Sequence, residues 1–171
     1  MKTLHLLRHA KSSWANAGLD DHERPLDPRG ARAATLMGIC LAQEGVRPGL
    51  VLCSSARRTR ETAERVLAEL PAKPPVVVER DLYLAAPSAL CERVQSLDAA
   101  LESVLVVGHN PGLHELAVWL AGSGDPQGLR RLRAKLPTGA WVELRFEGSA
   151  WNCVEPGRGE LGRFVAPKDL V

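Results

Sequence analysis

The chain has 171 residues, of which 45% are hydrophobic and 25% are charged, and its formal net charge at pH 7 is +2. This length and composition are typical of a single globular domain, here residues 1–171, that buries its own core. The near balance of charges argues against nucleic acid as a partner, and no apolar run approaches the ~20 residues of a membrane-spanning helix. We therefore predict neither a nucleic-acid-binding nor a membrane protein.

Four cysteines are spread along the chain without a CxxC pair or a Cys/His ligand spacing. We expect reduced thiols, no disulfide framework, no metal site and no cofactor. The N-terminus enters an apolar segment directly, without the charged leader and cleavage site typical of a signal peptide. The expected location is therefore the cytoplasm.

Short apolar runs alternate with amphipathic stretches as far as residue 121. In chain order they predict a strand at 4–7, a helix from 28 to the stop at Gly45, a strand at 50–53, a helix capped by Ser54 and Ser55 that runs to about residue 70, a strand at 76–78, a helix at 87–101, a strand at 103–107 and a helix at 111–121. The first helix has a clear start signal, because Asp27 is a typical N-cap and Pro28 suits the first helical position.

The last third of the chain has weaker signals. Gly122, Gly124 and Pro126 indicate a long loop that extends to about residue 133. Residues 138–146 and 150–154 predict an antiparallel pair around a turn at 147–149, and the tail from Pro156 is expected to be partly irregular. Strands that alternate with helices indicate an α/β fold, a three-layer α/β/α sandwich with a largely parallel central sheet.

Three of the predicted strands end in cationic or imidazole side chains. Arg8 and His9 follow the first strand, Arg57 and Arg58 follow the second, and His109 follows the strand at 103–107. Ligands of open parallel sheets bind outside the carboxyl ends of the strands. If these strands are neighbours, their terminal residues form one site.

Clustered arginines with two imidazoles suit a dianion with tetrahedral oxygens, and the starts of the two following helices add partial positive charge. Guanidinium groups disfavour a second cation, so a histidine among them stays neutral and nucleophilic. The predicted chemistry is attack by His9 on a phosphoryl group, which gives a phosphohistidine that water hydrolyses. No metal ion is needed, because the arginines neutralise the phosphoryl oxygens.

Four segments taken in order, LLRHAKSSW, DHERPLDPRG, SSARRTRETAE and VVGHNPG, resemble the histidine phosphatase superfamily. The resemblance covers most of residues 3–120 and implies a phosphoglycerate mutase-like fold and a metal-independent hydrolase. Within the superfamily, the short chain and the RPL segment are most similar to the SixA-type phosphohistidine phosphatases. Ala10 departs from the glycine that the superfamily usually has after the first histidine.

The resemblance also implies roles for individual residues. His9 resembles the phosphoryl-accepting nucleophile, and Arg8 resembles its phosphate-binding neighbour. Arg58, rather than Arg57, matches the phosphate ligand at the start of the second helix. His109 resembles the second histidine, which binds phosphate and stabilises the transferring group.

Two further binding residues have alternative interpretations. Arg24 resembles the third phosphate clamp of SixA-type members, but Asp20, Asp21 and Glu23 lie close enough in sequence to form a structural salt bridge with it. Ser13 is a candidate phosphate contact from the first loop, and a turn or cap explains it equally well.

The general acid of the superfamily has no unambiguous match. Asp81 is the best candidate by position, and Glu79 is the next. An ester needs a proton delivered to its alkoxide leaving group, which a positioned acid makes about 10²- to 10⁴-fold faster. A phosphoramidate such as phosphohistidine releases a much better leaving group, so the missing acid favours P–N substrates. Substitution of Asp81 is then expected to affect only ester hydrolysis.

The favoured function is removal of phosphate from phosphohistidine in a protein, such as a histidine-phosphorylated signalling domain. Two alternatives remain: a phosphatase for a small phosphomonoester, and a non-catalytic module that binds phosphate. The short spacing between the motifs predicts an open, shallow site that admits a phosphorylated side chain on a protein surface.

Overall fold

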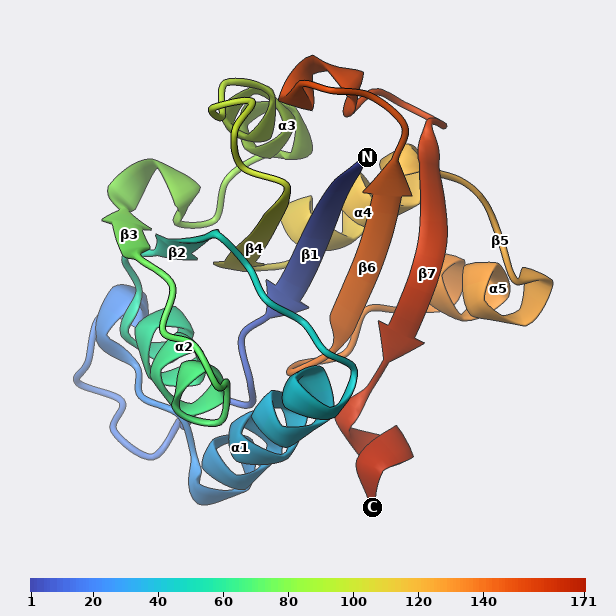
Figure 1. The fold of residues 1–171 in the computed structure, drawn as a ribbon. Helices are drawn as coiled ribbons and strands as arrows, with labels where there is room; N and C mark the ends of the chain where they lie inside the picture. The colour runs from blue at the N-terminus through green and yellow to red at the C-terminus, as the bar shows by residue number, and fades with distance from the viewer.

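A seven-stranded sheet forms the centre of the computed structural model, which describes residues 1–171 (Figure 1). The strands are β1 (Lys2–Arg8), β2 (Leu50–Ser54), β3 (Val76–Glu79), β4 (Ser103–Gly108), β5 (Ala121–Gly124), β6 (Trp141–Phe146) and β7 (Gly159–Val165). They lie in the order β3-β2-β4-β1-β6-β7-β5, and only β6 runs antiparallel to its neighbours. The predicted largely parallel sheet is confirmed.

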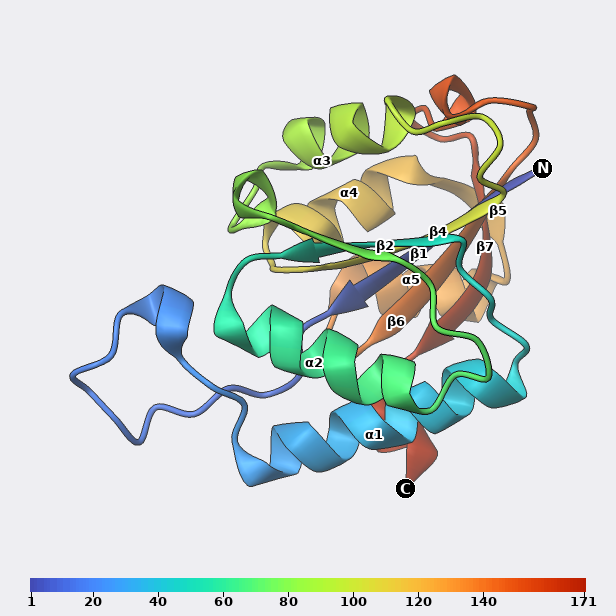
Figure 2. The same cartoon turned by 60° about the vertical axis from the view of Figure 1, so that its left-hand side comes forward.

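Helices cover both faces of this sheet, as Figure 2 shows. They are α1 (Pro28–Gln43), α2 (Arg57–Ala68), α3 (Pro87–Gln95), α4 (Gly112–Leu120) and α5 (Pro126–Ala134). The core is divided accordingly into two clusters, because neighbouring strand residues point to opposite faces. Leu6 packs in the cluster beneath α3 and α4, whereas Leu7 packs in the cluster beneath α1 and α2. None of the helices is long and apolar enough to cross a bilayer.

The start of α1 is fixed by its cap and by a close backbone contact. Asp27 Oδ1 accepts a hydrogen bond from the Gly30 N–H at 2.6 Å, as the sequence predicts for an N-cap. A Cβ atom at Gly30 would lie 2.0 Å from the carbonyl oxygen of Lys11, so only glycine allows this approach. The first turn of α1 therefore rests directly on the loop that follows His9.

The prediction of a long loop at residues 122–133 is wrong. These residues contain β5 and α5, and α5 begins with Pro126 after an Asp125 cap whose carboxylate accepts from the Gly128 N–H at 2.8 Å. This is the same cap-and-proline signal that starts α1. The nearby glycines obscured it, because they are more often found in loops.

The prediction that residues 138–146 and 150–154 form an antiparallel pair of strands is also wrong. β6 pairs instead with β1 and β7, and a short 3-10 helix occupies Trp151–Cys153. Trp151 is fully buried and donates its Nε1–H to the carbonyl of Leu101 at 2.9 Å, which anchors this segment in the core. The tail expected to be irregular forms β7 and the 3-10 helix η4 (Pro167–Leu170).

The predicted helix at 87–101 is shorter than expected, since α3 ends at Gln95. Leu97 and Leu101 nevertheless pack against the core beside α3 and α4. Their apolar spacing reflects burial in an irregular segment, and periodicity alone does not distinguish this from another helical turn.

Replacement of Asp27 by alanine is expected to lower the free energy of unfolding by about 1 kcal/mol, because the Gly30 N–H loses its side-chain acceptor. Urea unfolding of the variant and the wild type measures this difference. Asp20→Ala is the matched control, since Asp20 is exposed and its side chain caps nothing. Equal stabilities of wild type and Asp27→Ala would contradict the assignment of this cap.

Candidate active site

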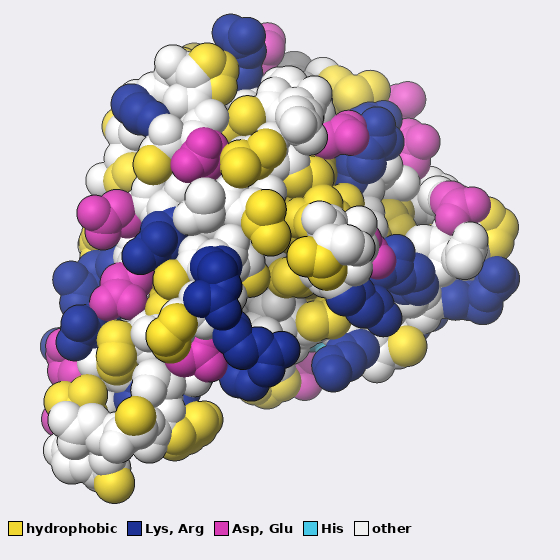
Figure 3. All heavy atoms as spheres, turned by 90° about the horizontal axis from the view of Figure 1, so that it is seen from below, with side chains coloured by type: hydrophobic (Ala, Val, Ile, Leu, Met, Phe, Trp, Pro, Cys, Tyr) yellow, Lys and Arg dark blue, Asp and Glu magenta, His cyan; other side chains and the backbone are white.

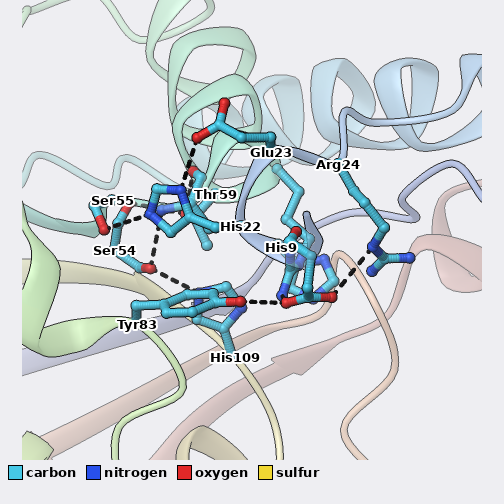
Figure 4. A network of polar contacts seen from close by, with 12 residues as sticks. His9, His22, Glu23, Arg24, Ser54, Ser55, Thr59, Tyr83 and His109 are labelled. Atoms are coloured by element: carbon cyan, nitrogen blue, oxygen red, sulfur yellow. Dashed lines mark hydrogen bonds and ion pairs between the residues drawn. The ribbon is translucent and has the colours of Figure 1, made fainter. Parts of the chain in front are cut away.

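The carboxyl ends of three neighbouring strands bring the predicted residues together. β2, β4 and β1 are adjacent in that order, so the segments that follow them meet at one edge of the sheet. The rings of His9 and His109 have centroids 5.3 Å apart and lie side by side in Figure 4. We call Arg8, His9, Arg24, Arg58 and His109 the Arg–His cluster.

His9 has a defined tautomer. Its Nδ1 lies 2.7 Å from the carbonyl oxygen of Ala10, and a carbonyl only accepts, so Nδ1 carries the hydrogen. Nε2 is therefore left with a free lone pair. The Ala10 backbone is not in the left-handed region, so alanine replaces the usual glycine there without strain. The Ala10 N–H donates to Thr62 Oγ1 of α2 at 3.0 Å, which fixes the loop.

Both imidazoles of the cluster are neutral at pH 7. Burial, together with the positive charges of Arg58, Arg8 and Arg24, lowers the pKa of His9 to about 4 against the opposing hydrogen bond to Ala10. Burial lowers the pKa of His109 to about 3, assisted by His9 and Arg58. A neutral imidazole is the form that is able to attack a phosphorus atom.

The arginines of the cluster are held by backbone carbonyls. Arg58, the second residue of α2, is 3% exposed and donates from Nη1 to the carbonyl of Asp21 at 2.7 Å. Arg8 donates from Nη1 to the carbonyl of Leu136 at 3.0 Å. Arg57 instead lies on the surface and pairs with Glu61 at 2.8 Å. The structure thus places Arg58, rather than Arg57, in the cluster.

Several buried polar atoms of the cluster have no hydrogen-bond partner within the protein. They are Arg8 Nε, Arg24 Nη1, Arg58 Nε and His109 Nδ1. Leaving such atoms unpaired is costly, and three of them are guanidinium nitrogens that bind oxyanions well. His109 Nε2 is already engaged, at 2.7 Å from Ser54 Oγ. The arrangement therefore fits a tetrahedral oxyanion bound among these atoms.

Sequence analysis missed two residues of the site, Asp21 and Tyr83. Asp21 Oδ1 accepts from Arg24 Nε at 3.2 Å, while Oδ2 accepts from Arg58 Nη2 at 3.0 Å and from the Tyr83 hydroxyl. The ring of Tyr83 meets that of His109 edge-on, with centroids 5.4 Å apart (Figure 4). The Arg24–Asp21 salt bridge that was one interpretation of the sequence is therefore present, and it lies inside the cluster.

Trp14 and His22 also border the cluster, from the segment between β1 and α1. The Trp14 ring is 76% exposed, and the Arg24 guanidinium carbon lies 3.4 Å from its centroid. His22 Nε2 lies 2.8 Å from Ser55 Oγ, and its ring meets Tyr83 edge-on. No motif indicated either contact, because each joins residues that lack a fixed sequence spacing.

The remaining candidates lie apart from the cluster. Ser13 Oγ accepts from the Ala15 N–H at 3.1 Å, which matches the turn interpretation, and its phosphate contact stays a prediction. Asp81 is exposed and lines a surface hollow with Glu79 and Arg93. Glu79 is bound to Arg93 at 2.6 Å. No hydrogen bond or ion pair joins either carboxylate to the cluster.

No group of three or more metal-binding side chains is assembled anywhere in the chain. The unpartnered guanidinium nitrogens of the Arg–His cluster are groups that bind an anion.

Comparison with known proteins identifies relatives for the whole chain. Residues 4–83 match the model of the histidine phosphatase superfamily (branch 1). The uncharacterised protein Rv1276c of Mycobacterium tuberculosis is 40% identical over 164 residues, which cover 95% of this chain and all of the relative. A structure from Nakamurella multipartitia, assigned as a phosphohistidine phosphatase SixA, is 30% identical with a TM-score of 0.80, covering 97% of this chain and 96% of the other.

A second similar structure is the protein histidine phosphatase SixA complexed with tungstate. Its TM-score is 0.77 at 23% identity, with 99% of each chain covered, so it supports the fold alone.

The pKa values of the two cluster histidines predict an unusual titration. The His9 and His109 ring protons are expected to shift in NMR spectra with midpoints of about 4 and about 3, because burial and neighbouring guanidiniums disfavour the charged imidazole. Spectra of His9→Ala and His109→Ala assign the two signals. A midpoint near the ordinary value of 6.5 for either ring would show that it is solvated and outside the influence of the arginines.

Proposed function

The chain belongs to the histidine phosphatase superfamily, with a phosphoglycerate mutase-like fold, and we propose that it is a metal-independent phosphatase that removes phosphate from phosphohistidine in proteins. One observation carries the proposal. The neutral His9, protonated at Nδ1 and free at Nε2, lies among buried guanidinium nitrogens that have no other partner. A nucleophile and an oxyanion site are thus assembled together.

In the first step, the phosphoryl oxygens bind Arg8, Arg24, Arg58 and His109. His9 Nε2 attacks phosphorus, the bond to the leaving atom breaks, and a phosphohistidine forms. The guanidinium groups offset the charge on the three phosphoryl oxygens throughout the transfer. Because Nδ1 keeps its hydrogen bond to the Ala10 carbonyl, the ring stays oriented while Nε2 changes its bonding.

In the second step, water attacks the phosphorus of the phosphohistidine and the P–Nε2 bond breaks. The electron pair returns to Nε2, which restores neutral His9, and inorganic phosphate leaves. His9 therefore ends the cycle in the neutral form in which it began, because the released imidazole takes up no proton at pH 7.

The preference for a P–N substrate rests on the leaving group and on the similarity to SixA. Neither Asp81 nor Glu79 contacts the Arg–His cluster, so neither of the acids suggested by the sequence is positioned near the leaving group. A phosphohistidine ring that carries a proton on its distal nitrogen leaves as a neutral imidazole. It is therefore released more easily than an alkoxide. The similarity to a structure assigned as SixA supports the same preference.

The preference for a protein substrate has a separate basis. Many Lys and Arg side chains are visible on the face shown in Figure 3. Arg29, Arg32 and Lys168 line a surface hollow with Leu36 and form no ion pair. The close contact between Gly30 and Lys11 joins the start of α1, which carries Arg29 and Arg32, to the loop after His9. The cationic face that these residues form suits an acidic protein surface that presents a phosphorylated side chain.

Wild-type protein mixed with a ³²P-phosphohistidine protein is expected to form an acid-labile phosphoenzyme, which rapid-quench sampling detects within the first turnover. His9→Ala is expected to give no labelled protein, because it lacks Nε2. His114→Ala is the matched control, since His114 contacts the Leu132 carbonyl away from the cluster and its loss leaves labelling intact. Labelling of His9→Ala would refute the assigned nucleophile, and absence of labelling in the wild type would favour a phosphate-binding module.

The substrate class is tested by comparing kcat/KM for a histidine-phosphorylated protein domain, for free phosphohistidine and for an aryl phosphate. We expect the protein domain to react fastest, because it adds contacts with the cationic face. Charge reversal at Arg32 is expected to reduce the rate for the domain and to leave that for free phosphohistidine unchanged. Faster turnover of the aryl phosphate would instead support the small-molecule phosphomonoesterase.

A further inference from the structure

An acidic side chain lies within the arginines that the proposed function assigns to phosphate. The two oxygens of Asp21 bind different guanidinium groups, Arg24 Nε at 3.2 Å and Arg58 Nη2 at 3.0 Å. No other carboxylate of the chain forms a hydrogen bond or ion pair with the cluster. An acid is thus in contact with the groups that are expected to bind the reacting phosphate.

The Asp21 carboxylate is far more exposed to solvent than the nucleophile. His9 is buried, with 7% of its surface exposed, whereas the Asp21 side chain is 45% exposed. In an in-line displacement the leaving atom lies opposite the nucleophile. A leaving atom directed away from the buried His9 points toward solvent, and Asp21 is the exposed acid that binds two of the guanidinium groups.

We infer that Asp21 is the general acid and general base of this phosphatase, and that the Tyr83 hydroxyl positions its carboxylate. The inference rests on the proposed function and assigns the proton-transfer step that Asp81 and Glu79 do not reach. Tyr83 suits the positioning role, since its hydroxyl donates to Asp21 Oδ2 while its ring packs edge-on against His109.

The proton and the electrons balance over both steps. With an ester, the P–O bond breaks toward oxygen as P–Nε2 forms, and the Asp21 carboxyl gives its proton to that oxygen. The resulting carboxylate then takes a proton from the water that attacks phosphorus, and the P–Nε2 pair returns to His9. The alcohol and hydrogen phosphate leave, and Asp21 is again a carboxyl group.

Substrate binding makes the surroundings of Asp21 more negative, which favours the protonated carboxyl group that a general acid needs. Without substrate, the hydrogen bond from Tyr83 and the charges of Arg58 and Arg24 hold the pKa of Asp21 below its ordinary value. A phosphoryl group engages both guanidiniums and brings negative charge beside the carboxylate, so both influences weaken. The proton arrives with the substrate, because a phosphate monoester has a second pKa of about 6.

The test separates a proton-transfer role from a structural one by varying the leaving group. Phosphoenzyme formation is measured by rapid quench for Asp21→Asn with phenyl phosphate and with 2,4-dinitrophenyl phosphate, whose leaving group needs no proton. With phenyl phosphate we expect formation to slow about 10²- to 10⁴-fold. With the dinitrophenyl ester we expect a near-normal burst of dinitrophenolate, followed by accumulation of phosphoenzyme, because hydrolysis lacks its base.

Two further variants accompany Asp21→Asn. Asp20→Asn makes the same chemical change at a neighbouring exposed carboxylate that caps nothing, and we expect wild-type kinetics from it. Tyr83→Phe removes only the positioning hydroxyl, so we expect a smaller loss with the same dependence on the leaving group. If Asp21→Asn fails to fold, the leaving-group dependence of Tyr83→Phe decides the question.

Other outcomes overturn the inference. If Asp21→Asn slows phosphoenzyme formation equally with both esters, Asp21 is only a structural partner of the arginines. If the variant has a lower KM and an unchanged kcat, Asp21 only competes with phosphate for the arginines. Unaltered rates with phenyl phosphate would exclude it as the acid. If wild type forms no phosphoenzyme with any substrate, the proposed function itself fails, and this result is distinct from all the others.

Discussion

Three guanidinium groups and two imidazoles share one small volume, and this crowding of like charge is the constraint on which the site depends. The protein meets it in two ways. The imidazoles stay neutral, so that only the arginines carry charge, and the arginines are held by fixed oxygen atoms such as the Leu136 carbonyl and the Asp21 carboxylate. The neutral histidine of the proposed chemistry is therefore a consequence chiefly of burial, and the crowding of positive charge reinforces it.

Such a cluster requires a rigid scaffold, and several non-neighbouring segments provide it. The loop after β1 is tied to α2 through Thr62 and to the Gly139 N–H, which donates to the carbonyls of Arg8 and His9. Gly139 has a φ of 74°, which glycine adopts without strain. The loop that carries His9 is thus held from two sides, by Thr62 of α2 and by the backbone of Gly139.

The sequence predicts features that are encoded locally. Apolar runs define the strands of the parallel half of the sheet, and Asp27-Pro28 defines the start of α1. The same pattern at Asp125-Pro126 went unrecognised among glycines. Non-local features were out of reach: β6 pairs with β1 across the whole chain, and Tyr83 meets Asp21 62 residues away. Hydrophobic periodicity does not predict such contacts, because they join residues that are far apart in sequence and meet only in the folded protein.

The Trp14 ring against Arg24 affects the entropy of ligand binding. A free arginine side chain has about 2 kcal/mol of rotamer entropy, which a bound anion must otherwise remove. Here the indole face lies 3.4 Å from the guanidinium carbon, and Asp21 holds the edge of the group. Much of that ordering is completed during folding. The exposed Trp14 ring thereby lowers the conformational entropy that the Arg24 side chain would lose when an anion binds.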